Sequence, residues 1–162
     1  IQFIPLRSKS IDVIISNHAL EPNGKNLLNL LKELFRVAKK KIVLFEPSYE
    51  LNSKRGKKRM TKLGYIKNIS SHVKKAGGTL INFIPLVNNR NSLNPTACYV
   101  ILPPKTSIKK SDEIILTSPG SNFILKKDKG FYFCKERGLA YPIFKKIPIL
   151  KNTSSIIATA NF

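Results

Sequence analysis

The chain has little of several residues and patterns that would point to particular classes of protein. Its two cysteines, Cys98 and Cys134, have neither disulfide nor metal-ligand spacing, so a disulfide-stapled scaffold is excluded and a reduced, cytoplasmic setting is expected. No apolar run is long enough to predict a membrane span, and the first residues do not resemble a signal peptide. Because the chain begins with Ile1 rather than Met, we expect a fragment or a processed product.

Acidic residues are also scarce. Nine Asp and Glu stand against 29 Lys and Arg, for a net charge of +20, and no acid occurs between residues 51 and 111. Such a surface attracts polyanions through counterion release. Lys, Ile and Asn are abundant together, however, as in chains encoded by AT-rich DNA. A working polyanion site, such as an RNA-binding surface, and a merely solvated basic surface therefore both stay open.

The residues that are present predict an α/β fold over the first two-thirds of the chain. Ile11–Ser16 is a short β-branched run typical of a fully buried strand, and Ile42–Phe45 is a second one. Between them, leucines recur at helical spacing over residues 27–38. A strand, a helix and a strand with short joints predict a right-handed βαβ unit with parallel strands.

The remaining residues of the first two-thirds predict four further segments. We expect an exposed basic stretch at Lys54–Lys62, a helix at Met60–Ala76, and strands at Thr79–Leu86 and Thr96–Leu102. Pro103-Pro104 then indicates a boundary, so we expect one domain over residues 1–103 and a second over residues 104–162.

The last third predicts a small β-rich module. Strands are expected at Ile114–Thr117, Phe123–Lys126 and Phe131–Cys134, and the last two should form a hairpin around Asp128-Lys129-Gly130. Shorter extended pieces and a final helical turn are expected at Tyr141–Ile143, Ile147–Leu150 and Ser155–Ala160. A module of this size is marginal alone without a staple or a partner.

Several stretches of the first part resemble class I methyltransferases that use S-adenosylmethionine. SIDVIISNHALEPN is similar to the family's fourth strand and following loop, and LLKELFRVAKKKIVLFEPSYE to its next helix and fifth strand. GYIKNISSHVKKAGGTLINFIPL and NPTACYVILPP resemble its last helix and closing strand pair. The resemblance implies a partial Rossmann-like sheet with flanking helices, in which the last strand, Thr96–Leu102, runs antiparallel to its neighbours.

The resemblance also implies what these residues lack. Family members begin with three further strands, which carry a glycine-rich turn for the cofactor and an acid for its ribose, and no G-x-G triplet occurs in this sequence. A chain of these residues alone would therefore leave the nucleoside unheld.

The resemblance places a site after the two parallel strands. Ser16 and Asn17 follow the fourth strand, where the family contacts the methionine end of its cofactor. His18 could be a catalytic general base, because an imidazole titrates near neutrality. Glu46 and Tyr49, after the fifth strand, would line the acceptor pocket. A loop histidine, a capping asparagine, a solvated acid and a packing tyrosine are the ordinary interpretations of these residues.

Glu21 lies in the same turn and suits a solvated acid near the start of a helix. The family's turn continues with a histidine, where this chain has Pro22.

The last third has its own resemblance. LTSPGSNFIL and GFYFCKERGLAYPIFKKIPIL resemble the small zinc-ribbon-like domain that activates tRNA, rRNA and release-factor methyltransferases. Zinc-bearing members hold the metal with two C-x-x-C knuckles, and a tetrahedral site needs four such ligands. Here the knuckles read Ser118-Pro119-Gly120-Ser121 and Cys134-Lys135-Glu136-Arg137, so we expect no metal. Tyr141–Ile143 would be core, and a hydrophobic face would dock on the methyltransferase sheet or on a protein partner.

Two functions follow from these observations. The first is transfer of a methyl group from S-adenosylmethionine to an unidentified acceptor, by a chain that needs its missing cofactor-binding half. The alternative is a module without catalysis that binds RNA or a protein, or that activates a methyltransferase.

Overall fold

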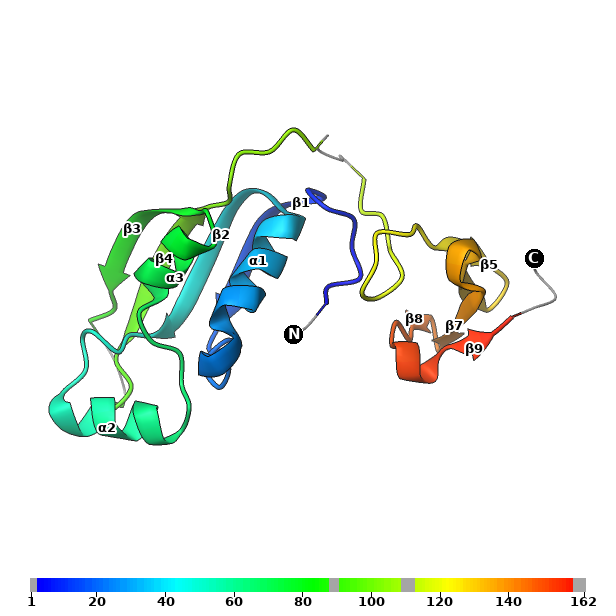
Figure 1. The fold of residues 1–162 in the computed structure, drawn as a ribbon. Helices are drawn as coiled ribbons and strands as arrows, with labels where there is room; N and C mark the ends of the chain where they lie inside the picture. The colour runs from blue at the N-terminus through cyan, green and yellow to red at the C-terminus, as the bar shows by residue number, and fades with distance from the viewer. Residues whose placement is uncertain (1–2, 88–90, 109–112, 159–162) are drawn as a thin grey trace.

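The computed structural model describes residues 3–87, 91–108 and 113–158, which form two sheets and three α-helices (Figure 1). One sheet has four strands and the other has five. The described part of the chain is therefore a mixed α/β protein, as the sequence predicts. None of its helices is long and apolar enough to cross a membrane.

The first sheet contains both parallel and antiparallel neighbours. Its strands are β1 (Ile11–Asn17), β2 (Ala38–Pro47), β3 (Thr79–Pro85) and β4 (Thr96–Leu102). The spatial order is β1-β2-β4-β3, with β1 parallel to β2 and β4 antiparallel to both β2 and β3. The predictions of a parallel first pair and an antiparallel last strand are both confirmed.

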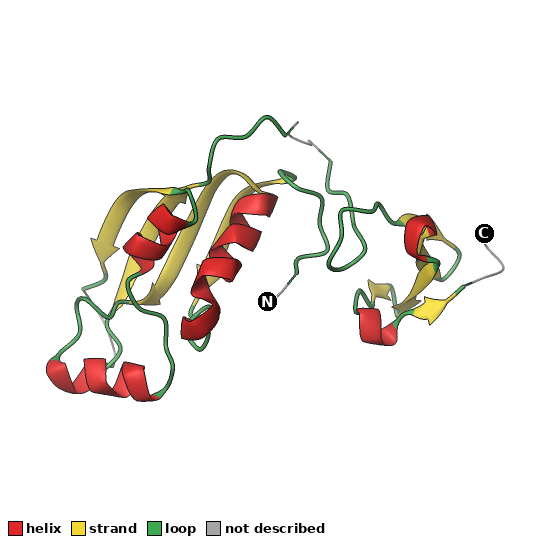
Figure 2. Ribbon diagram, in the orientation of Figure 1, coloured by secondary structure: helices red, strands yellow, loops and turns green. Residues whose placement is uncertain are grey.

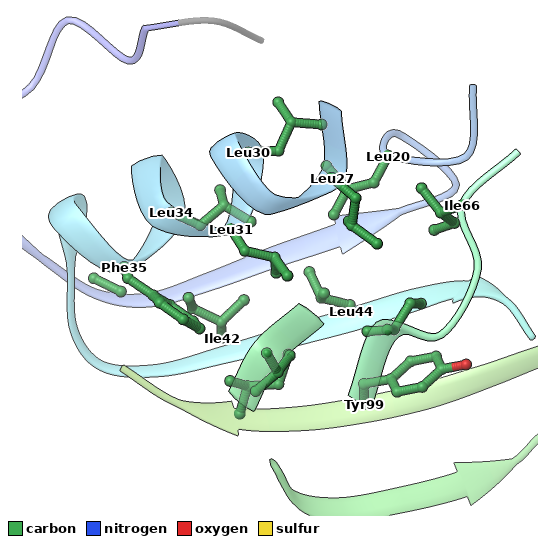
Figure 3. Packing of buried hydrophobic residues seen from close by; sticks show 14 of the residues in the cluster. Leu20, Leu27, Leu30, Leu31, Leu34, Phe35, Ile42, Leu44, Ile66 and Tyr99 are labelled. Atoms are coloured by element: carbon green, nitrogen blue, oxygen red, sulfur yellow. The ribbon is translucent and has the colours of Figure 1, made fainter. Parts of the chain in front are cut away.

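Helix α1 (Leu27–Val37) connects β1 to β2 and supplies most of the core. Its buried residues recur three and four apart, so they form one stripe that faces the sheet: Leu27, Leu30, Leu31, Leu34 and Phe35. This stripe packs on Ile42 and Leu44 of β2 and on Tyr99 of β4 (Figure 3). Helix α3 (Ile69–Lys75) adds Ile69 and Val73 to the same core, so α1 and α3 cover one face of the sheet (Figure 2).

The opposite face of the first sheet is not covered by any described element. Val13 and Ile15 of β1 are 45% and 69% exposed, and Ile84 of β3 is 47% exposed. β1 is also an edge strand, because β2 is the neighbour with which it pairs. The prediction that Ile11–Ser16 is fully buried is therefore wrong for Val13 and Ile15. Only the opposite face of β1 packs against the helices.

The single helix predicted over Met60–Ala76 is wrong. The structure has two helices, α2 (Lys54–Lys62) and α3, so the basic stretch predicted to be merely exposed is itself helical. Gly64 and Asn68 lie between them in the left-handed conformation, with φ of 68° and 52°, which an α-helix cannot accommodate. Ser53 caps α2 by accepting a hydrogen bond from the backbone of Gly56 at 3.1 Å.

The second sheet occupies the C-terminal part of the described chain. Its strands are β5 (Lys126–Asp128), β6 (Phe131–Cys134), β7 (Leu139–Phe144), β8 (Ile147–Pro148) and β9 (Ile156–Ile157). The hairpin around Asp128-Lys129-Gly130 is confirmed, because β5 and β6 pair antiparallel on either side of it.

Three of the predicted elements in this part are wrong. Residues 114–117 and 123–126 form only isolated bridges, Leu6 to Leu116 and Thr117 to Ile124, apart from Lys126, which begins β5. The expected helical turn over residues 155–160 is replaced by a 3₁₀ turn at Asn152–Ser154 and by β9, while residues 159–160 lie outside the described part.

The two segments compared above with zinc knuckles, residues 118–121 and 134–137, meet in a hydrogen-bonded network. Arg137 Nη1 donates to Ser118 Oγ and to the carbonyl of Pro119, both at 3.0 Å. The hydroxyls of Ser118 and Tyr141 are 2.8 Å apart, and Tyr141 donates to Asn152 at 2.8 Å. Of the predicted core residues Tyr141–Ile143, Tyr141 is buried, whereas Pro142 and Ile143 are only half-buried. Among the described residues, no group of three or more His, Cys, Asp or Glu side chains could hold a metal ion.

The N-terminal segment, blue in Figure 1, contacts both α1 and the residues that precede the second sheet. Arg7 N donates to the carbonyl of Ile115 at 2.9 Å, and Thr117 N donates to that of Pro5 at 3.0 Å. On its other side, Arg36 of α1 donates to the carbonyls of Ile4 and Leu6, both at 2.8 Å. Residues 4–7 therefore lie between α1 and the start of the small module.

Candidate functional site

The candidate site lies where β1 and β2 end and β4 begins. Asn17 pairs with Phe45, so the two parallel strands finish at the same edge of the sheet. β4 is antiparallel, so its first residue, Thr96, lies at that edge as well, opposite Pro47. In α/β sheets the carboxyl edge of the parallel strands is where ligands bind.

Glu46 is the buried centre of this edge. It is 0% exposed, and its Oε1 accepts hydrogen bonds from Ser16 Oγ at 2.8 Å and from Leu20 N at 3.1 Å. Its Oε2 is buried without a hydrogen-bond partner among the described residues. Burial raises the pKa of Glu46, although the hydrogen bonds from Leu20 and Ser16 oppose the shift. Glu46 therefore fixes the loop after β1 rather than facing solvent.

His18 is held at both ring nitrogens. Nδ1 lies 2.7 Å from Glu21 Oε2, and Nε2 lies 3.0 Å from Thr96 Oγ1. A carboxylate only accepts, so in the neutral ring Nδ1 donates to Glu21 and Nε2 accepts from the Thr96 hydroxyl. The backbone of His18 is left-handed, with φ of 52°, and its N–H donates to the carbonyl of Phe45.

This arrangement gives His18 the geometry of an oriented base. Glu21 fixes the tautomer that leaves Nε2 basic, and Thr96 occupies that position. Because the Thr96 hydroxyl occupies Nε2, a ligand would contact this nitrogen only after that hydroxyl turns away.

The other residues predicted from the sequence lie in different surroundings. Asn17 is exposed at the end of β1, and Ser16 is half-buried with its hydroxyl on Glu46. Tyr49 contacts cations instead: Lys57 Nζ and Lys67 Nζ lie 5.5 and 5.4 Å from the centre of its ring. The structure thus gathers Ser16, His18 and Glu46 in one cluster and places Tyr49 on the basic surface beside α2.

Thr96, Asn94 and Tyr65 belong to this site, and the sequence did not indicate them. Asn94 Nδ2 donates to Glu21 Oε1 at 3.4 Å. Tyr65 also meets Glu21, and this hydrogen bond raises the pKa of the tyrosine. The one available signal was the position of Thr96 at the start of an antiparallel strand, because such a residue returns to the edge where the parallel strands end.

Deeper in the sheet, Tyr99 of β4 lies behind this edge (Figure 3). Burial raises the pKa of Tyr99 to about 12, so its hydroxyl stays protonated at neutral pH. Tyr99 therefore adds no charge to the core behind the candidate site.

A site for S-adenosylmethionine would find candidate contacts on only one side among the described residues. Asn17 offers an exposed amide, and Glu46 has an unpaired carboxylate oxygen under the same loop. The part that grips the nucleoside is a glycine-rich turn, and this sequence has no G-x-G triplet. If the cofactor binds here, Asn17 and the loop over Glu46 would face its methionine end, and other residues would have to hold its nucleoside.

Comparisons with protein families, with curated proteins and with solved structures find no match to this chain.

Proposed function

We propose that this chain takes part in methyl transfer from S-adenosylmethionine and supplies the methionine-side wall and the acceptor side of the site. The observation that carries the proposal is the strand order. β4 is the last strand of the sheet in sequence, lies between β2 and β3, and is antiparallel to both. This is the arrangement that the resemblance to class I methyltransferases implies.

The polar loop after β1 supports the same function. It places Asn17 and the oriented imidazole of His18 at the carboxyl edge of the parallel pair. Methyl transfer is an in-line displacement at the sulfonium, so the protein contributes mainly by positioning the two reactants. His18 would hold or remove a proton at the acceptor atom.

The uncovered face and the open edge of β1 also support the proposal. Parallel α/β sheets are normally covered on both faces. Here Val13 and Ile15 are exposed on an edge strand that can still take a neighbour. We propose that further polypeptide, in the same chain or in a partner, completes the sheet there and holds the nucleoside.

The test is to read the coding frame ahead of Ile1, to produce the protein with the segment it encodes, and to titrate it with S-adenosylhomocysteine by calorimetry. We expect a segment with a glycine-rich turn, and binding that Asn17→Ala weakens at least tenfold. Asn122→Ala, an exposed asparagine on the small module, is the matched control. A frame without such a segment, together with no binding, would refute the proposal.

A further inference from the structure

Two adjoining depressions beside the candidate site form a basic surface, here called the lysine track. The first has a volume of about 580 Å³ and is lined by Tyr49, Lys54, Lys57, Lys58, Thr61 and Lys62. The second has a volume of about 370 Å³, and its lining includes Lys25, Thr61, Tyr65, Lys67 and His72. Thr61 belongs to both, so the track is continuous along α2 and into the connection that follows it.

Helix α2 carries a dense positive charge without a described ion pair. Six of the nine residues of α2 are Lys or Arg, and no described ion pair joins any of them to a carboxylate. Like charges spaced four apart, such as Lys54 and Lys58, repel each other on a helix. An anionic ligand would remove this repulsion.

Buried contacts hold helix α2 in place. Met60 is 0% exposed, and Gly56 is buried against the side chain of Asn52. Asn52 Nδ2 in turn donates to the carbonyl of Leu93 at 3.0 Å. The buried side of α2 is therefore anchored, while Lys54, Arg55 and Lys58 are exposed.

Two aromatic rings, those of Tyr49 and Tyr65, lie among the cations of the track. Lys57 and Lys67 lie over the ring of Tyr49, and the guanidinium of Arg59 lies 5.4 Å from the centre of the Tyr65 ring. The sequence around α2 alone indicates little aromatic interleaving, but the fold brings Tyr49 to it from the end of β2. Rings for bases and cations for phosphates are the two features by which proteins bind single strands.

The track ends at the candidate site. Ile66 N donates to the carbonyl of Glu21, and Gly24 N donates to that of Gly64, both at 3.0 Å. Glu21 is also the residue that orients His18. A ligand lying along the track would therefore reach the loop that carries the imidazole.

We infer that the lysine track binds single-stranded nucleic acid, and that this strand is the methyl acceptor. The second half of the inference rests on the proposed methyl transfer, and the first half does not. A duplex keeps its bases stacked inside and would leave Tyr49 and Tyr65 unused, whereas an acidic protein would need the lysines but not the rings.

The first experiment measures binding of a fluorescein-labelled single-stranded RNA to the full chain by anisotropy, over a series of KCl concentrations. Lys57→Gln/Lys58→Gln/Lys62→Gln should weaken binding at least tenfold at low salt and flatten the dependence of log K on log[KCl] by about two, near 0.7 per lost phosphate contact. The matched control removes the same charge from exposed lysines of the small module, Lys126, Lys127 and Lys129. Equal losses in both variants would overturn the track as a specific site.

The second experiment tests whether bases are stacked. Tyr49→Leu keeps the net charge, so it should leave the salt dependence unchanged but weaken binding at least fivefold. Unchanged affinity in this variant, equal affinity for duplex RNA of the same sequence, or equal competition by poly-glutamate would each overturn single-strand recognition.

Binding is measured without cofactor, so the two proposals fail separately. Track-dependent RNA binding by a protein that binds no S-adenosylhomocysteine supports the track and overturns only methyl transfer. Cofactor binding without track-dependent RNA binding overturns the track alone.

Discussion

Replacement of Gly24 by alanine tests the contact between the loop that carries His18 and the connection that follows α2. A Cβ atom on Gly24 would lie 2.5 Å from the carbonyl oxygen of Tyr65 and 2.6 Å from that of Gly64. Both obstacles are backbone atoms, so no side-chain rotation relieves the overlap. The hydrogen bond from Gly24 N to Gly64 O must lengthen or break as the two segments move apart.

The size of the effect follows from two contributions. Loss of one backbone hydrogen bond costs about 1 kcal/mol. Forced displacement of packed backbone costs about 1–3 kcal/mol more. Gly24→Ala should therefore lower the free energy of unfolding by about 2–4 kcal/mol, measured by urea denaturation with circular dichroism. The same displacement should weaken binding of single-stranded RNA, because it moves the candidate site away from the lysine track.

Gly64→Ala is the control, because it lies in the same contact but has free space around it. No atom lies within 4 Å of the Cβ position of Gly64, although its φ is 68°. Alanine at this position should lower the free energy of unfolding by only about 1–2 kcal/mol, because alanine adopts the left-handed conformation less readily than glycine. If Gly24→Ala proves no more destabilising than Gly64→Ala, the close approach at Gly24 is not as described.

Three further predictions concern other parts of the fold. Because burial raises the pKa of Glu46, its carboxyl group holds a proton more tightly in the folded state than in the unfolded chain. The stability that this group contributes is therefore lost as pH rises above 4.5, the ordinary pKa of a glutamate. Glu46→Gln should remove that loss, and urea titrations of both proteins between about pH 4 and 7 measure it; parallel curves would contradict the reasoning. Tyr141→Phe removes the hydroxyl between Ser118 and Asn152 and should destabilise the small module by about 1–2 kcal/mol, seen as faster amide exchange in β6 and β7. Leu31→Ala, at a fully buried position, should cost about 2–5 kcal/mol in a thermal or urea melt, whereas exposed Lys32→Ala should cost almost nothing, and similar losses would place the core elsewhere.

The elements of the first sheet could be predicted because their patterns are local. The spacing of the leucines predicts helix α1, and the β-branched runs on either side of it predict the strands β1 and β2. The prediction failed between Met60 and Ala76, where the apolar residues keep a helical spacing but Gly64 and Asn68 reverse the backbone. Whether φ is positive at an asparagine depends on the contacts of the folded chain. The spacing of apolar residues carries no information about those contacts.

The candidate site could be predicted only in part, for the same reason. Ser16 and His18 were found because they lie at the end of a strand and directly after it. The buried state of Glu46 depends on the loop that folds over it, and the partner of His18 on β4, Thr96, is 78 residues away in sequence. Pairing across that separation depends on which strands are neighbours, and the sequence predicts the direction of the last strand but not its register.

The attachment of the N-terminal segment has a consequence for the order in which the protein folds. Pro5 and Arg7 pair with residues 115–117, so these contacts close a loop that contains the whole first sheet. Closing so long a loop is entropically unfavourable until its interior is compact. Arg36 and Glu33 can fix residues 4–6 only after α1 has formed. The small module should therefore dock last, and its docking should report on whether the large sheet has already folded.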